Sequence, residues 1–311
     1  MRFVLSLACR LRPPEELGPD RIVRLASEAG LEGIALDASV TMALLPVLAA
    51  GALRSGLLVG ASLCPLADGP LGRGKRLPYL SAHGPEERLT AVQLATRTIE
   101  AGSTLGVRSF ALELGPAPLE TREPELRLAF ARRQMGPGEP GGVVLHVALE
   151  ERRARGPRIL DACRSALEPL LALAERAGVD LAIPVAATPW QVPSPREAQL
   201  LMEEFTGAPL GIALSPARWA VLEALQLPRA AERWTSLARQ SRLVWASDCV
   251  GLETELLPGL GELDWSKTGG WPTEVTSILT GAPDATIREV QRARRRLAEA
   301  SPASGPTAAA P

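Results

Sequence analysis

Residues 167–183 have the sequence LEPLLALAERAGVDLAI, in which a helical pattern passes into a strand. Four apolar residues recur at the three- and four-residue spacing of one helix face: Leu167, Leu170, Leu171 and Ala174. Gly178 ends this pattern, and the apolar run that follows at residues 179–183 is typical of a buried β-strand. Pro169, inside the helical pattern, predicts either a kink or a helix that begins there.

Strand-like runs of this kind alternate with helical patterns along the whole chain. Eight such runs begin near Phe3, Gly33, Leu57, Val107, Val179, Leu210, Leu243 and Trp271. The helical patterns between them have recognisable starts, for example at Pro19 and Pro85. This alternation predicts an α/β protein, and eight strands favour a closed (β/α)8 TIM barrel over an open doubly wound sheet. No G-x-G-x-x-G motif follows the first strand, which weakens the dinucleotide-binding alternative.

One segment departs from the alternation. We expect residues 1–300 to form a single TIM-barrel domain with an insertion at residues 116–158, between strands four and five. Residues 136–142, GPGEPGG, are typical of a flexible loop. Such an insertion would be either a surface excursion or a lid or docking surface for a protein partner. The Ala- and Pro-rich residues 301–311 are predicted to be a flexible tail.

Composition excludes several classes of protein. Apolar residues make up 46% of the 311 residues, so the chain can bury a full core. A formal net charge of −1 and an aromatic content of 4% disfavour nucleic acid as the main partner. The apolar run at residues 3–8 is too short for a secretory signal, and the run at residues 40–53 is too short to cross a bilayer.

The cysteines indicate a compartment. Cys9, Cys64, Cys163 and Cys249 lie far apart in the sequence, and no C-x-x-C spacing occurs. Isolated cysteines of this kind suit a reducing cytosol, where each behaves as a small apolar residue. We therefore expect a cytoplasmic protein with no membrane partner.

Four motifs, in order along the chain, carry a family resemblance. They are RIVRLASEAGLEGI at residues 21–34, IEAGSTLGV at residues 99–107, LAERAGVDLAI at residues 173–183 and GELDW at residues 261–265. Together they resemble the xylose-isomerase-like barrel superfamily, which includes sugar isomerases and epimerases, inosose-pathway enzymes and endonuclease IV. The resemblance extends over residues 15–280 and implies the barrel fold.

The resemblance also implies a divalent metal at the carboxyl-terminal mouth of the barrel, held by carboxylates and imidazoles. This sequence departs from that ligand pattern. Strand five would end at Pro184 in place of a glutamate, Ser215 stands near the aspartate position after strand six, and Trp245 stands on strand seven in place of a histidine. Glu274, near strand eight, is the one acid left in the pattern. We therefore predict no metal site and no cofactor.

The two histidines do not replace the missing ligands. His83 is expected in a solvated loop, and His146 is expected to be a partly buried packing residue in the irregular region. Arg292, Arg294, Arg295 and Arg296 form a basic cluster on a helix that begins near Asp284, and a solvated helix face accounts for them.

Polar and aromatic residues near the predicted strand ends define a candidate site. Asp37 and Glu113 are the candidate acid/base pair for catalysis. The candidate substrate-binding residues are Arg218, Asp248, Trp190, Trp245 and Ser215, with Arg218 able to hold an anionic or sugar-like ligand. Alternatively, the acids pair with arginines or cap helices, and the tryptophans belong to the core.

These observations leave several functions open. The first hypothesis is a sugar isomerase/epimerase-like barrel without the usual metal ligands, acting as a non-catalytic binding or accessory protein or as a metal-independent enzyme. The alternative is a metal-dependent sugar or inosose isomerase/epimerase with displaced ligands, to which His146 could contribute. A DNA-repair nuclease is disfavoured by the neutral charge and the shortage of histidine.

Overall fold

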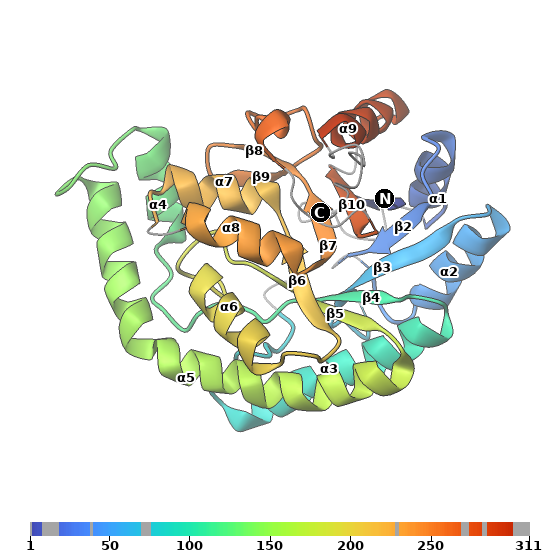
Figure 1. The fold of residues 1–311 in the computed structure, drawn as a ribbon, viewed down its shortest axis with the longest axis horizontal. Coiled ribbons are helices and arrows are strands. Elements are labelled where there is room, and N and C mark those ends of the chain that lie inside the picture. Colours follow the sequence, from blue (N-terminus) through green and yellow to red (C-terminus); the bar gives the residue numbers. More distant parts are fainter. Residues whose placement is uncertain are drawn as a thin grey trace, which may run out of the picture.

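Eight parallel strands close into a barrel in the computed structural model, which describes residues 2–7, 19–37, 40–69, 76–227, 230–268, 274–281 and 285–300. Their order around the barrel is β1-β10-β7-β6-β5-β4-β3-β2. Helices surround the strands (Figure 1). The predicted (β/α)8 TIM barrel is confirmed. The predicted tail at residues 301–311 lies outside the described residues.

The strands agree with the apolar runs in the sequence. The barrel strands are β1 (Arg2–Leu7), β2 (Gly33–Leu36), β3 (Leu58–Cys64), β4 (Ser109–Leu112), β5 (Asp180–Pro184), β6 (Leu210–Leu214), β7 (Ser241–Ala246) and β10 (Thr276–Gly281). Every residue of β2, β4 and β6 is buried. Helices cover the outer face of the barrel, and side chains from the other strands fill its interior. The strand start expected near Trp271 lies outside the described residues.

Nine α-helices are described. They are α1 (Pro19–Glu28), α2 (Leu45–Arg54), α3 (Pro85–Thr104), α4 (Glu123–Ala131), α5 (Pro140–Ala177), α6 (Pro195–Glu204), α7 (Pro216–Ala224), α8 (Ala230–Arg239) and α9 (Ile287–Ala300). The helix starts predicted at Pro19 and Pro85 are confirmed. None of these described helices is both long enough and apolar enough to span a bilayer.

The first and last strands of the barrel pair with each other where the barrel closes. β1 pairs with β10 over six residue pairs, from Arg2 with Thr276 to Leu7 with Gly281. Outside these strands, α9 lies beside α1 (Figure 1), and the Gln291 amide of α9 donates a hydrogen bond to the Glu28 carbonyl oxygen at 3.3 Å. Closure therefore depends on residues that are far apart in the sequence.

The segment at residues 116–158 is not an irregular loop. It contains α4 and the first half of α5, a continuous helix of 38 residues that passes through Pro157 and Pro169. A helix start at Pro169 is therefore wrong, and residues 136–142 form the turn into α5 and its first residues. Both prolines are exposed, so water can satisfy the carbonyls that lose a partner.

A buried ion pair anchors this part of α5. The Arg152 guanidinium donates to Glu197 of α6 at 2.5 Å and to the Gln191 carbonyl at 3.3 Å. The sequence did not indicate the hairpin of β8 (Asp248–Val250) and β9 (Glu253–Leu256), which follows β7.

Close approach of two strands explains one glycine of the first motif. A Cβ atom on Gly33 would lie 2.3 Å from the Leu58 carbonyl oxygen of β3. This oxygen belongs to the backbone, so the clash cannot be relieved by a side-chain rotation. Only a glycine therefore lets β2 and β3 pair at this distance.

Gly33→Ala should lower the free energy of unfolding by about 1–3 kcal/mol, because the β3 backbone must shift to admit the methyl group. Chemical denaturation measures this loss. Gly84→Ala is the matched control, since no atom lies within 4 Å of its Cβ position and its φ is −68°. Equal stability of the Gly33 variant and the native protein would contradict the steric argument.

The described cysteines are buried and free. Cys64, Cys163 and Cys249 lie in the core, and burial raises the pKa of the Cys163 thiol to about 12 and that of Cys249 to about 11. Burial also raises the pKa of Cys64. In the folded protein these thiols stay protonated at a pH at which they would ionise in the unfolded chain.

Stability should therefore fall at alkaline pH. The folded state binds more protons than the unfolded state above about pH 9, so the free energy of unfolding decreases as pH rises, by about 1.4 kcal/mol per pH unit for each such thiol. Denaturation in urea at several pH values measures the slope. Cys163→Ala should give a shallower slope, and an unchanged slope would show that Cys163 does not contribute.

Candidate functional site

A cavity of about 200 Å³ lies at the carboxyl-terminal mouth of the barrel. Five residues singled out in the sequence line it: Asp37, Glu113, Ser215, Arg218 and Trp245. They follow or end β2, β4, β6 and β7, and a parallel barrel brings all these strand ends to one face. Its volume is below the roughly 300–1,000 Å³ of sites for drug-sized molecules, so this cavity suits a small ligand.

Glu113 and Arg218 form the charged contact of the cavity. An Nη2 atom of Arg218 lies 3.7 Å from a carboxylate oxygen of Glu113, and the two side chains are 20% and 43% exposed. The Ser215 hydroxyl caps α7 by accepting from the Arg218 backbone N–H at 3.3 Å. This places the Arg218 cation in the first helical turn, where the helix dipole opposes it, and the carboxylate of Glu113 offsets that cost.

Asp37 lies deeper in the cavity wall. Its carboxylate accepts a hydrogen bond from the Ser6 hydroxyl of β1 at 2.9 Å, and the residue is 5% exposed. Ser6 pairs in register with Thr280 of β10, which also lines the cavity. The Thr280 hydroxyl is buried and has no hydrogen-bond partner among the described residues, which is unusual for a buried polar group. A ligand hydroxyl in the cavity could satisfy it.

The sequence did not indicate Tyr79, which forms another wall. Tyr79 belongs to the loop before α3, and the Ser81 N–H of this loop donates to the Leu114 carbonyl at 2.8 Å. Gly115 has a φ of +113°, and a Cβ atom there would lie 2.6 Å from the Tyr79 side chain. Gly115, two residues after Glu113, was the available signal, because it permits the tyrosine to pack beside the end of β4.

The β8–β9 hairpin supplies a further wall through Thr254 and Glu255. Helix α4 holds the hairpin turn: the Arg127 guanidinium donates to the Leu252 carbonyl at 3.0 Å and to Glu253 at 2.6 Å. Part of the predicted insertion thus braces a wall of the cavity. No periodicity in the sequence links α4 to this hairpin.

Charges in the described lining are unequal. Asp37, Glu113 and Glu255 are acidic, and Arg218 is the one basic residue among the described residues that line the cavity. The formal charge of the described lining is therefore −2. Such a lining favours a neutral polar ligand over an anion.

Two predicted substrate-binding residues do not line this cavity. Trp190 is 5% exposed, and its indole N–H donates to the Glu120 carbonyl at 2.8 Å. Asp248 is fully buried and accepts four hydrogen bonds of 2.8–2.9 Å, from the backbone of Cys249, Gly259 and Leu263 and from the indole of Trp265. Both residues hold loops in place.

Asp248 also accounts for the GELDW motif. A Cβ atom on Gly261 would lie 2.4 Å from an Asp248 carboxylate oxygen, while Leu263 and Trp265 donate to that carboxylate. Asp264 caps the short 3-10 helix η2 (Trp265–Lys267). The motif therefore folds around a buried carboxylate.

Asp248→Ala should lower the free energy of unfolding by about 3 kcal/mol or more, because it leaves several buried donors without an acceptor. Asp248→Asn keeps one acceptor oxygen and should lose less. Urea denaturation followed by tryptophan fluorescence measures both. Native stability of Asp248→Ala would contradict the structural role of this carboxylate.

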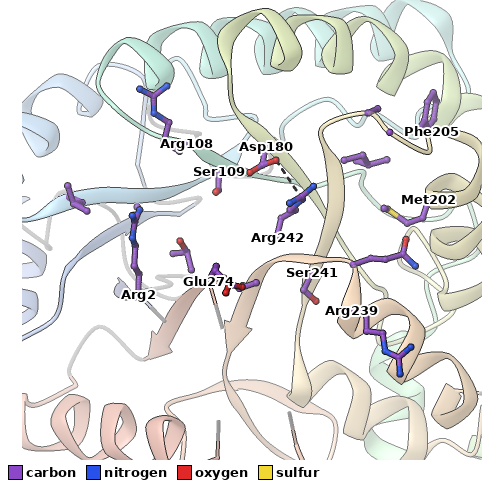
Figure 2. Close-up of a pocket in the computed structure, with 18 of the residues that line it drawn as sticks. Arg2, Arg108, Ser109, Asp180, Met202, Phe205, Arg239, Ser241, Arg242 and Glu274 are labelled. Carbon is purple, nitrogen blue, oxygen red and sulfur yellow. Dashed lines mark ion pairs between the residues drawn. The ribbon is translucent and has the colours of Figure 1, made fainter. Parts of the chain in front are cut away.

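Glu274 lies at the opposite end of the barrel. It precedes β10 at the amino-terminal face, where it lines a different cavity together with Arg2 and Arg242 (Figure 2). Its assignment to the metal-binding mouth is therefore wrong, because the strand begins after it. His83 and His146 are both exposed, and His146 lies on α5 and not in an irregular region.

The mouth does not fit the divalent metal that the family resemblance implies. No group of three or more His, Cys, Asp or Glu side chains converges within the described part of the chain. Pro184 ends β5, Trp245 lies on β7, and the Arg218 guanidinium stands beside Glu113. A fixed cation next to the accessible carboxylate opposes a second cation at that position.

Comparison with solved structures shows the same architecture elsewhere, although no family model and no curated protein sequence matches this chain. The structure of the 3-keto-D-glucoside 4-epimerase YcjR from E. coli superimposes with a TM-score of 0.61 at 13% sequence identity. The alignment covers 96% of this chain and 98% of the epimerase chain. A candidate xylose isomerase from Rhodospirillum rubrum has a TM-score of 0.63 at 17% identity, over 92% of this chain and 95% of its own.

A third structure, of D-psicose 3-epimerase in the presence of D-fructose, has a TM-score of 0.58 at 12% identity. It covers 96% of this chain and 97% of its own. These TM-scores show a common fold, and at identities this low the likeness extends to the fold alone. The resemblance stated from the four sequence motifs is thus confirmed at the level of the fold.

Proposed function

We propose, from the xylose-isomerase-like barrel fold of this chain, that its mouth cavity binds a small neutral sugar or related polyol without a divalent metal. The observation that carries the proposal is the composition of the cavity. It combines the Glu113–Arg218 ion pair, the unpaired Thr280 hydroxyl and the aromatic residues Tyr79 and Trp245 in about 200 Å³.

Each group in the cavity suits a part of such a ligand. Carboxylate and guanidinium form charge-assisted hydrogen bonds with hydroxyl groups, as acceptor and donor respectively. The rings of Tyr79 and Trp245 offer apolar surface to the C–H faces of a sugar. The net acidic lining argues against the anionic ligand that Arg218 alone suggested. The separated cysteines support a cytoplasmic location as part of this proposal.

A second candidate is metal-independent proton transfer on the bound sugar. It is favoured by the position of Glu113, whose carboxylate is accessible from the cavity and lies beside a guanidinium. Glu113 would exchange a proton with the carbon next to a carbonyl, while Arg218 would stabilise the oxyanion that forms. Asp37 would complete the acid/base pair from the deeper wall.

Isothermal titration with D-fructose and D-tagatose, the sugars in crystal structures of two fold relatives, tests the proposal. We expect saturable binding that Glu113→Gln and Arg218→Met each weaken about tenfold or more, because each variant removes a charge-assisted contact. Arg122→Met and Glu125→Gln, from an exposed ion pair on α4, are the matched controls and should bind as the native protein does.

Metal content and turnover distinguish the remaining functions. The protein is incubated with Mn²⁺, Co²⁺, Zn²⁺ and Mg²⁺, desalted and analysed by mass spectrometry. Near-stoichiometric retained metal would overturn the proposal in favour of a metal-dependent isomerase or epimerase. Sugar interconversion by metal-free protein, lost in Glu113→Gln, would support the second candidate.

A further inference from the structure

A second and larger cavity opens at the amino-terminal face of the barrel. Its volume is about 920 Å³, within the range of small-molecule sites. The beginnings of β1, β3, β4, β5, β6, β7 and β10 contribute to its lining. In Figure 2, Arg2, Ser109, Asp180, Ser241, Arg242 and Glu274 surround one opening.

Small residues leave this end of the barrel hollow. Gly60, Ser109, Ser241 and Thr276 line the cavity at or near the starts of four strands, and their small side chains take up little of its volume. A Cβ atom on Gly60 would lie 2.6 Å from Val4 and 3.6 Å from Thr276, which places the inner layer of the barrel directly behind the cavity. Met202 and Phe205 of the α6 end form an apolar side wall.

The cavity is rich in arginine. Four arginines and two acids line it: Arg2, Arg108, Arg239, Arg242, Asp180 and Glu274. The formal charge of the described lining is +2, although the whole chain has a formal net charge of −1. Arg242 lies 3.7 Å from Asp180, the contact drawn in Figure 2.

The other three guanidinium groups are available to a ligand. Among the described residues, no side chain forms an ion pair or hydrogen bond with the guanidinium of Arg2, Arg108 or Arg239. They come from β1, from the residue before β4 and from the end of α8, and they lie on different sides of the opening (Figure 2). All three residues are exposed. Arginine side chains bind phosphate and carboxylate groups through two parallel N–H donors.

We propose that this cavity is a binding site for a small ligand with two or more anionic groups, either phosphates or carboxylates. Concave walls on several strand starts suit a small molecule, and Phe205 is the one aromatic residue in the described lining, which offers little stacking surface for nucleic-acid bases. TIM-barrel chemistry takes place at the other face, so this site binds its ligand away from the mouth cavity and independently of the function proposed there.

Titration calorimetry with inorganic pyrophosphate and with succinate, at low ionic strength and with any tag at the carboxyl terminus, tests the site. We expect saturable pyrophosphate binding that added NaCl weakens. The double variant Arg2→Ala/Arg108→Ala should weaken it about tenfold or more. If succinate binds about as tightly as pyrophosphate, the site accepts phosphates and carboxylates alike. If pyrophosphate binds and succinate does not, the site is specific for phosphates.

The control removes the same charge from another cluster. Arg292→Ala/Arg295→Ala takes two exposed arginines from α9 and should leave pyrophosphate affinity unchanged. Equal loss in the two double variants, or no saturable binding of either probe to the native protein at millimolar concentration, would overturn the proposal. Circular dichroism verifies that each variant is folded.

Discussion

The pairing of β1 with β10 is the contact on which the rest of the structure depends. Six residue pairs join two strands from opposite ends of the sequence and turn an open parallel sheet into a barrel without edges. Once the barrel is closed, every strand has its carboxyl end at one face and its amino end at the other. The two cavities are consequences of this closure, since each is lined by residues from strands that are distant in the sequence.

Closure also places Ser6 beside Thr280 at the mouth and Arg2 beside Thr276 at the other end. The two ends differ in chemistry. The described lining of the mouth has a charge of −2 and contains aromatic side chains, whereas that of the opposite cavity has a charge of +2 and contains small residues. One barrel with a nearly neutral total charge thus has two cavities with different electrostatic environments.

The additions to the barrel have a structural purpose around the mouth. Helix α4 fixes the β8–β9 hairpin through Arg127, and Asp248 fixes the chain that follows the hairpin by accepting three hydrogen bonds from Gly259, Leu263 and Trp265. The hairpin in turn brings Glu255 to the cavity. A polar residue that looks chemically reactive in the sequence, such as Asp248, can thus be fully occupied in holding a loop.

The sequence by itself determined the barrel, because strand-like runs and helix starts are local patterns with their own periods. It also determined which strand ends carry Asp37, Glu113, Ser215, Arg218 and Trp245, since a residue that follows a parallel strand must lie at the mouth. Only the tertiary structure decided that Tyr79, Glu255 and Thr280 join them, that Asp248 and Trp190 do not, and that Glu274 lies at the opposite face. Those outcomes depend on contacts between distant segments and on the residue at which each strand begins, and neither leaves a periodic signal in the chain.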